Sequence, residues 1–200
     1  MRSFVIGFLV ALLVVAATVY IYFSTGAAPV AVDAQAMPFE RSLANKALHA
    51  RVEKEMPKTP PPVQANEETF MAGAHIYAEH CALCHGLPGQ ASEMGSNEFP
   101  RAPWLFKGKG VTDDPVAESY WKIENGIRLT GMPKFKGHIS DTEIWQVALL
   151  VANADKLPPS VQQYLARQSV EPGEAAEHSE ASDHHDADHD HAHGGAGPHN

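Results

Sequence analysis

The N-terminal part of the chain is an unbroken apolar run. Residues 4–23 carry no charged side chain, and Arg2 is the only charged side chain before them. At about 1.5 Å per residue, a helix of this length spans roughly 30 Å, the thickness of a bilayer's hydrocarbon core. We expect residues 1–24 to be a signal anchor with its N-terminus in the cytoplasm, because positive flanks stay on that side. A cleaved signal peptide is the alternative, although its apolar region is normally only about 7–15 residues long.

Residues 25–66 are predicted to be a linker that contains one short helix. Residues 39–56 place apolar side chains on one stripe at helical spacing: Phe39, Leu43, Ala47, Leu48 and Val52. Pro57 ends this helix, and Pro60–Pro62 form a stiff, extended spacer. We interpret the helix as a spacer that packs on its neighbour or on the membrane surface, without chemistry of its own.

The pattern in residues 67–170 predicts a folded all-α domain. Helices are expected at 67–80, 112–126 and 140–155, separated by glycine- and proline-rich loops at 86–110 and 126–138. The last helix opens with Ser140-Asp141-Thr142-Glu143, a capping-box pattern that precedes an apolar stripe. No segment alternates convincingly as a strand does. Loops this long in a small domain need something to pack against, and a large apolar cofactor would supply it.

Residues 171–200 differ in composition from the rest of the chain. They hold eight acidic residues, no Lys or Arg, and seven of the twelve histidines. Such a segment cannot bury a core, so we predict that it is disordered. Its imidazoles could bind copper, zinc or nickel weakly; they belong to His178, His184, His185, His189, His191, His193 and His199. The net charge of −9 disfavours nucleic acid as a partner, since a phosphate-binding domain needs a basic face.

The only two cysteines lie in one short motif, Cys81-Ala82-Leu83-Cys84-His85. C-x-x-C-H is the attachment signature of a c-type haem. Two thiols three residues apart can reach two vinyl groups on one edge of a porphyrin, and the adjacent histidine is then carried to the iron. Three alternatives compete with a single covalent haem: a thioredoxin-like redox pair, a zinc site completed by His75, His80 or His138, and a structural disulfide.

Iron that is bound by His85 needs a second axial ligand, and Met132 is the best candidate. It lies between Gly131 and Pro133, which make a turn that can aim the sulfur inward. A thioether is neutral and soft, so it raises the reduction potential relative to a second histidine. Two alternatives stay open: Met132 fills the core, or His138 is the ligand.

These motifs together resemble a class I cytochrome c. The resemblance rests on Gly73, Tyr77, the Cys81–Gly86 motif, Ala102–Leu105, Asn125–Pro133 and the helix of Trp145, and it covers roughly residues 67–158. Within that class, the chain is similar to the membrane-anchored monohaem forms of bacterial electron-transport chains. The resemblance implies a cytochrome c fold, with helices around one covalently bound haem.

The resemblance also implies roles for single residues. Gly73 and Tyr77 would face the Trp145 helix, where a glycine lets two helices cross closely. The carbonyl of Pro103 would accept a hydrogen bond from His85 and fix its tautomer. Three further residues are candidates for contacts with the haem propionates: Tyr120, Trp121 and Arg128.

A six-coordinate iron has no open position for a substrate, so we expect an electron carrier and not an enzyme, although it could be a subunit of an oxidoreductase complex. The haem domain would lie on the periplasmic side of the cell membrane, near its redox partners. A basic rim would steer an acidic partner; its candidates are Lys107, Lys109, Lys122, Arg128, Lys134 and Lys136. The alternative is a haem sensor or small oxidoreductase in which Met132 leaves the iron.

Overall fold

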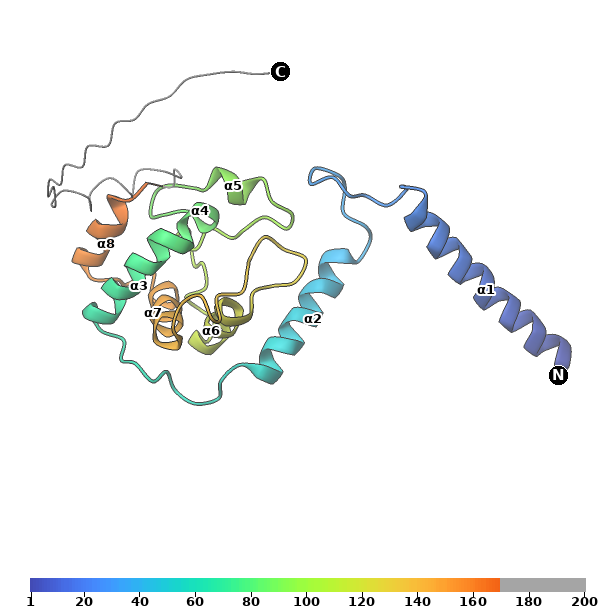
Figure 1. Cartoon of the computed structure of the whole chain (residues 1–200), viewed down its shortest axis with the longest axis horizontal. Helices are drawn as coiled ribbons and strands as arrows, with labels where there is room; N and C mark the ends of the chain where they lie inside the picture. The colour runs from blue at the N-terminus through green and yellow to red at the C-terminus, as the bar shows by residue number, and fades with distance from the viewer. Residues whose placement is uncertain (170–200) are drawn as a thin grey trace, which may run out of the picture. The chain divides into compact units, whose positions relative to one another are not determined.

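The computed structural model describes residues 1–169, and within that range the secondary structure consists of helices without strands. Their order is α1 (Arg2–Ser24), α2 (Glu40–Glu55), α3 (Glu67–His80), α4 (Ala82–His85), α5 (Glu93–Ser96), α6 (Val116–Asn125), α7 (Asp141–Ala152) and α8 (Pro159–Ala166) (Figure 1). The predicted all-α class is therefore confirmed. The predictions for the histidine-rich segment at 171–200 lie outside the described residues.

Local signals set where the helices of the domain begin. The Asn66 side chain accepts a hydrogen bond from the backbone N–H of Thr69 at 2.9 Å and so caps α3. At α7 the predicted capping box is present, because Ser140 and Glu143 each accept a hydrogen bond from the other's backbone N–H. Helix α6 begins later than predicted, since Pro115 is its N-cap and the preceding residues form a turn. The short helices α4 and α5 and the terminal α8 were not predicted.

The core forms where α3 crosses α7, with α6 packed on α7 and α8 on α3. A Cβ atom at Gly73 would lie 2.4 Å from the carbonyl oxygen of Gln146 on α7, so the two backbones touch at this point. The close crossing expected of Gly73 is present. Beside it, the rings of Tyr120 and Trp145 stack with their centroids 4.0 Å apart and join α6 to α7.

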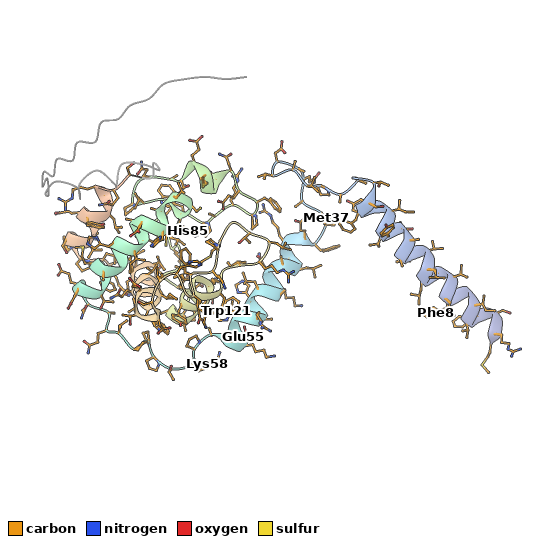
Figure 2. The ribbon with its side chains drawn as sticks, viewed as in Figure 1. Phe8, Met37, Glu55, Lys58, His85 and Trp121 are labelled. Carbon is orange, nitrogen blue, oxygen red and sulfur yellow. The ribbon has the colours of Figure 1, made fainter. Side chains whose placement is uncertain are left out.

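The segment before the domain contains α1 and α2. No residue of α1 is buried, and α1 is the one helix in residues 1–169 that is long and apolar enough to cross a membrane (Phe8 is labelled on it in Figure 2). Helix α2 packs against α6, and its Val52 is 1% exposed. The other end of its predicted apolar stripe is not buried, since Phe39 is 76% exposed and Leu43 is 64% exposed.

Candidate functional site

A cavity of about 220 Å³ lies among the helices of the domain. Its wall is mainly apolar and draws on α2, α3, α4, α6, α7 and the loops between them. Four of the residues predicted to carry chemistry line it, although they come from two segments far apart in the chain: Cys81, Cys84, His85 and Met132. The structure thus gathers the thiols, the imidazole and the thioether around one space.

The attachment motif forms a tight turn at the junction of α3 and α4. The backbone N–H groups of Cys84 and His85 both donate to the carbonyl oxygen of Cys81, at 3.1 and 2.9 Å. Gly86 ends α4 with a φ of +70°, and a Cβ atom there would lie 2.6 Å from the carbonyl oxygen of Gln90. Only glycine satisfies both conditions. The buried hydroxyl of Tyr77 donates to the carbonyl oxygen of Gly86 at 2.8 Å and ties the turn to α3.

The His85 imidazole (labelled in Figure 2) is held in one tautomer. Its Nδ1 atom lies 2.8 Å from the carbonyl oxygen of Pro103, and a carbonyl can only accept, so Nδ1 is the donor. The Nε2 atom therefore carries the free lone pair of the neutral ring. Burial lowers the pKa of His85, which favours that neutral form, while the hydrogen bond to Pro103 acts in the opposite direction. This is the contact that the resemblance implies, and it leaves Nε2 able to bind a metal ion.

Both cysteines are free thiols. Burial raises the pKa of Cys81 to about 12, and the neighbouring Cys84 adds to this effect. The pKa of Cys84 is also raised, first by burial and then by Glu98, whose carboxylate accepts a hydrogen bond from Cys84 Sγ at 3.4 Å. Each sulfur is thus a protonated thiol at neutral pH.

The loop that carries Met132 is tied to the C-terminal end of α6. The backbone N–H of Met132 donates to Thr130 Oγ1 at 3.1 Å, and the carbonyl oxygen of Met132 accepts from Ile127 at 3.2 Å. A Cβ atom at Gly126, which has a φ of +67°, would lie 2.6 Å from the carbonyl carbon of Pro133. These contacts fix the half-buried Met132 side chain in the cavity wall.

Helix α5 lies directly against the attachment motif. The Ser92 hydroxyl donates to the carbonyl oxygen of Leu83 and accepts from the backbone N–H of Gly95. A Cβ atom at Gly95 would lie 1.9 Å from the carbonyl oxygen of Cys84. The long loop predicted at 86–110 is therefore partly ordered as a support for the motif.

Other predicted residues lie elsewhere. Tyr120, Trp121 and Arg128 are not among the residues that line the cavity. The Tyr120 hydroxyl donates to the Asp141 carboxylate, and its pKa is raised by burial and by that bond. Of the alternative ligands, His138 is exposed and outside the lining, whereas His80 lines the cavity with its Nε2 atom 3.6 Å from Glu79 Oε1.

Half of the expected basic rim is paired with acidic side chains of the same chain. Three of its six residues, Lys109, Lys122 and Lys136, pair with the carboxylates of Asp113, Glu118 and Glu124 at 3.5, 2.6 and 2.6 Å. Lys107 lies over the Trp104 ring, 5.3 Å from its centroid.

Several residues of the cavity wall were not predicted from the sequence, among them Glu98 and Leu48. Glu98 brings a carboxylate to the cavity, and Leu48 reaches it from α2. The apolar stripe on α2 included Leu48, but helical spacing alone could not show which part of the protein the stripe packs against. For Glu98 the sequence held no signal, because its contacts with Cys84 and Gly131 exist only in the folded chain.

The chemistry of the cavity fits a porphyrin better than the other sites considered. No group of three or more His, Cys, Asp and Glu residues that could hold a metal ion occurs in residues 1–169. The βαβ unit that a thioredoxin-like pair requires is missing from the same range. An apolar cavity lined by two adjacent thiols, one imidazole with a free Nε2 and one thioether matches the donor set of a c-type haem.

Comparisons with known proteins find relatives that include cytochromes. The family model described as "Cytochrome C oxidase, cbb3-type, subunit III" matches residues 68–151. Cytochrome c6 of Leptolyngbya boryana is 32% identical over 80 residues, which cover 40% of this chain and 86% of that protein. The match to an almost complete small protein shows which part of the chain is the shared domain.

Two longer proteins match over part of their length. The cbb3-type cytochrome c oxidase subunit CcoP of Cereibacter sphaeroides is 32% identical over 80 residues, which are 40% of this chain and 25% of that subunit. Quinohemoprotein alcohol dehydrogenase ADH IIB of Pseudomonas putida is 25% identical over 115 residues, which are 58% of this chain and 15% of that enzyme. The chain therefore spans a quarter or less of these two relatives, and the shared part is one domain of each.

Proposed function

Because the chain belongs to the c-type cytochromes, whose domain carries covalent haem c, we propose that it is a membrane-tethered one-electron carrier with a single haem. The observation that carries this proposal is that Cys81, Cys84, His85 and Met132 line one cavity. When bound, the haem supplies an iron that gains and loses one electron. A single haem is proposed because the chain has only two cysteines and one C-x-x-C-H motif.

Cys81 and Cys84 would hold the porphyrin through two thioethers. Each S–H group would add across one vinyl double bond, with the sulfur bonding to one carbon and the hydrogen going to the other. No oxidant or reductant is consumed. The raised pKa values keep both sulfurs protonated until this addition. The turn that brings the two cysteines together sets the spacing of the two bonds.

His85 and Met132 would bind the iron from its two faces. His85 offers Nε2, since Nδ1 is committed to Pro103, and Met132 offers its thioether sulfur. His80 is the competing donor in the wall, but its imidazole lies beside Glu79. With His85 and Met132 both bound to it, the iron would have no position left for a substrate, and the site would carry electrons.

The apolar wall would raise the reduction potential. A dry, low-dielectric site favours the iron state of lower charge, and a methionine ligand acts in the same direction. The wall includes Leu105, Ile123 and Val147. We therefore propose a potential in the upper part of the c-type range, suited to transfer toward a terminal acceptor.

Helix α1 would anchor the domain to the outer side of the cell membrane, with Arg2 on the cytoplasmic side. An anchor confines the carrier near other membrane proteins and raises its effective concentration there. Since CcoP is a subunit of a cytochrome c oxidase, we propose membrane redox complexes as electron donor or acceptor.

Two measurements on the haem-loaded full chain test the proposal. A pyridine haemochrome assay should report one thioether-bound haem in the wild type and a changed or absent signal in Cys81→Ala and Cys84→Ala. The reduced protein should not bind carbon monoxide, while Met132→Ala should bind it. A colourless wild type would contradict the haem assignment. Wild type that binds carbon monoxide readily would instead favour the sensor or oxidoreductase alternative, because its iron would have an open position.

A further inference from the structure

Helix α2 lies outside the segment that matches the family model, yet it contributes to the cavity. The match begins at residue 68, whereas α2 ends at Glu55. Leu48 on α2 nevertheless lines the same cavity as Cys81, His85 and Met132. The sequence pattern predicted a spacer that packs on its neighbour or on the membrane surface, without chemistry of its own. A spacer has no reason to place a leucine in the wall of the cofactor site.

The packing of α2 is specific along its length. At one end, the Arg41 guanidinium lies over the Phe99 ring, 5.6 Å from its centroid, next to the cavity residue Glu98. In the C-terminal half, Val52 is 1% exposed. Between them, His49 Nδ1 lies 3.9 Å from Glu118 Oε1 on α6. Helix α2 packs beside α6 (Figure 1). Its last residue, Glu55, and Lys58, which follows the helix, are labelled in Figure 2.

The apolar residues of α2 divide into two groups. Leu48 and Val52 are one turn apart and face the domain, while Leu43 is 64% exposed. Leu43 and Leu48 are the same residue type on the same helix, and they differ in whether they meet the cavity. This contrast shows that α2 presents one selected side to the domain, and it supplies a matched pair for an experiment.

We propose that α2 is a wall of the haem pocket, in which Leu48 keeps water away from the haem. This inference rests on the proposed function, since it assigns α2 a role toward the haem of that same site. Leu48 lines the cavity together with α6 residues such as Ile123 and so contributes to its apolar lining. Removing that side chain opens the pocket to water, which stabilises the more highly charged ferric iron and lowers the reduction potential.

The assignment of α2 to the domain also shortens the tether to α1. If α2 were part of a free linker, residues 25–66 would separate the anchor from the haem domain. With α2 docked, only residues 25–39 remain between Ser24 and Glu40. Fifteen residues reach about 50 Å at full extension, against about 110 Å for the longer segment with α2 as a helix inside it. The haem is thereby confined close to the membrane surface.

The test compares Leu48→Ser with Leu43→Ser in the haem-loaded full chain, with Leu48→Ala as a milder variant. Both serine variants lose the same apolar side chain from the same helix and add no charge. We expect Leu48→Ser to lower the midpoint potential, Leu48→Ala to lower it by less, and Leu43→Ser to leave it unchanged. Hydrogen exchange on the same proteins, and on the chain expressed without haem, should show faster exchange in α2 and α6 for Leu48→Ser alone.

Equal potentials and equal exchange in the Leu48 and Leu43 variants would overturn the inference and return α2 to the role of a spacer. Failure of the proposed function is a separate result, because it would appear as a wild type without thioether-bound haem. In that case the exchange measurement on the chain without haem still tells whether Leu48 docks α2 on the cavity. Faster exchange at Leu48→Ser alone would support the docking, and equal exchange would contradict it.

Discussion

The Nδ1 atom of His85 donates a hydrogen bond to the carbonyl oxygen of Pro103, 2.8 Å away and 18 residues further along the chain. The bond joins the attachment motif to the loop that follows α5, and it leaves Nε2 as the ring atom that can bind iron. The acceptor is a backbone atom, so the orientation of the ring depends on the path of the loop. The Pro103 side chain affects this hydrogen bond only through its influence on the backbone of the loop.

This geometry predicts that His85→Ala abolishes the low-spin haem spectrum and reduces the yield of haem-loaded protein, because one axial ligand is lost. His138→Ala is the matched control, since His138 is exposed and outside the cavity lining. It should keep the wild-type spectrum and yield. The absorption spectra of the reduced proteins and haem staining of denatured protein make the comparison. A low-spin spectrum in His85→Ala would contradict the assigned ligand.

Gly126→Ala is expected to detach Met132 from the iron while the haem stays covalently bound. A Cβ atom at Gly126 would lie 2.6 Å from the carbonyl carbon of Pro133, so the loop that presents Met132 must move. The loss of the long-wavelength sulfur-to-iron charge-transfer band of the ferric protein, together with new carbon monoxide binding, would report the change.

Gly137→Ala is the control that separates the steric clash at Gly126 from the backbone strain of replacing a glycine with positive φ. Gly137 also has a positive φ, of +86°, but a Cβ atom there would meet nothing within 4 Å. Both substitutions carry the cost of placing a side chain at a positive φ, of about 1 kcal/mol or more, and only one displaces the loop. Retention of the charge-transfer band in both variants would show that the position of Met132 does not depend on Gly126.

Gly73→Ala should destabilise the domain, although alanine is the better helix former. Helix propensity alone favours alanine by about 0.5–1 kcal/mol. Against this, the added Cβ atom would lie 2.4 Å from the carbonyl oxygen of Gln146, and such overpacking costs about 1–3 kcal/mol. We expect a net loss of roughly 1–2 kcal/mol, measured by denaturant unfolding of the haem-loaded chain. A more stable variant would mean that α3 and α7 can separate at no cost.

The sequence predicted the features that depend on local pattern. The capping box at Ser140 and the helix before Cys81 each need only a short motif to be identified, whereas the glycine crossing at Gly73 was implied by the family resemblance. The C-x-x-C-H motif and the Met132 turn likewise carry their chemistry in a few consecutive residues. These are the parts of the site that the structure places around the cavity.

The features that the sequence did not predict depend on contacts between distant segments. Glu98 meets Cys84 because α5 folds back on α4, and Leu48 reaches the cavity because α2 docks on α6. The resemblance implied that Tyr120 lies near the propionates. The structure shows two further contacts of Tyr120 that the sequence did not predict, from its hydroxyl to Asp141 and from its ring to Trp145.

Glu98→Gln should make the Cys84 thiol more reactive in the chain expressed without haem. The Glu98 carboxylate stabilises the protonated thiol by accepting its hydrogen bond at 3.4 Å, and its negative charge opposes formation of the thiolate. Removing that charge lowers the pKa of Cys84, so the rise of the alkylation rate with pH should shift to lower pH.

Iodoacetamide kinetics in a Cys81→Ser background isolate Cys84. Glu93→Gln removes an exposed charge from neighbouring α5 and should leave the profile unchanged. An identical shift in both variants would show that the long-range charge of the chain, and not the contact with Glu98, controls this thiol.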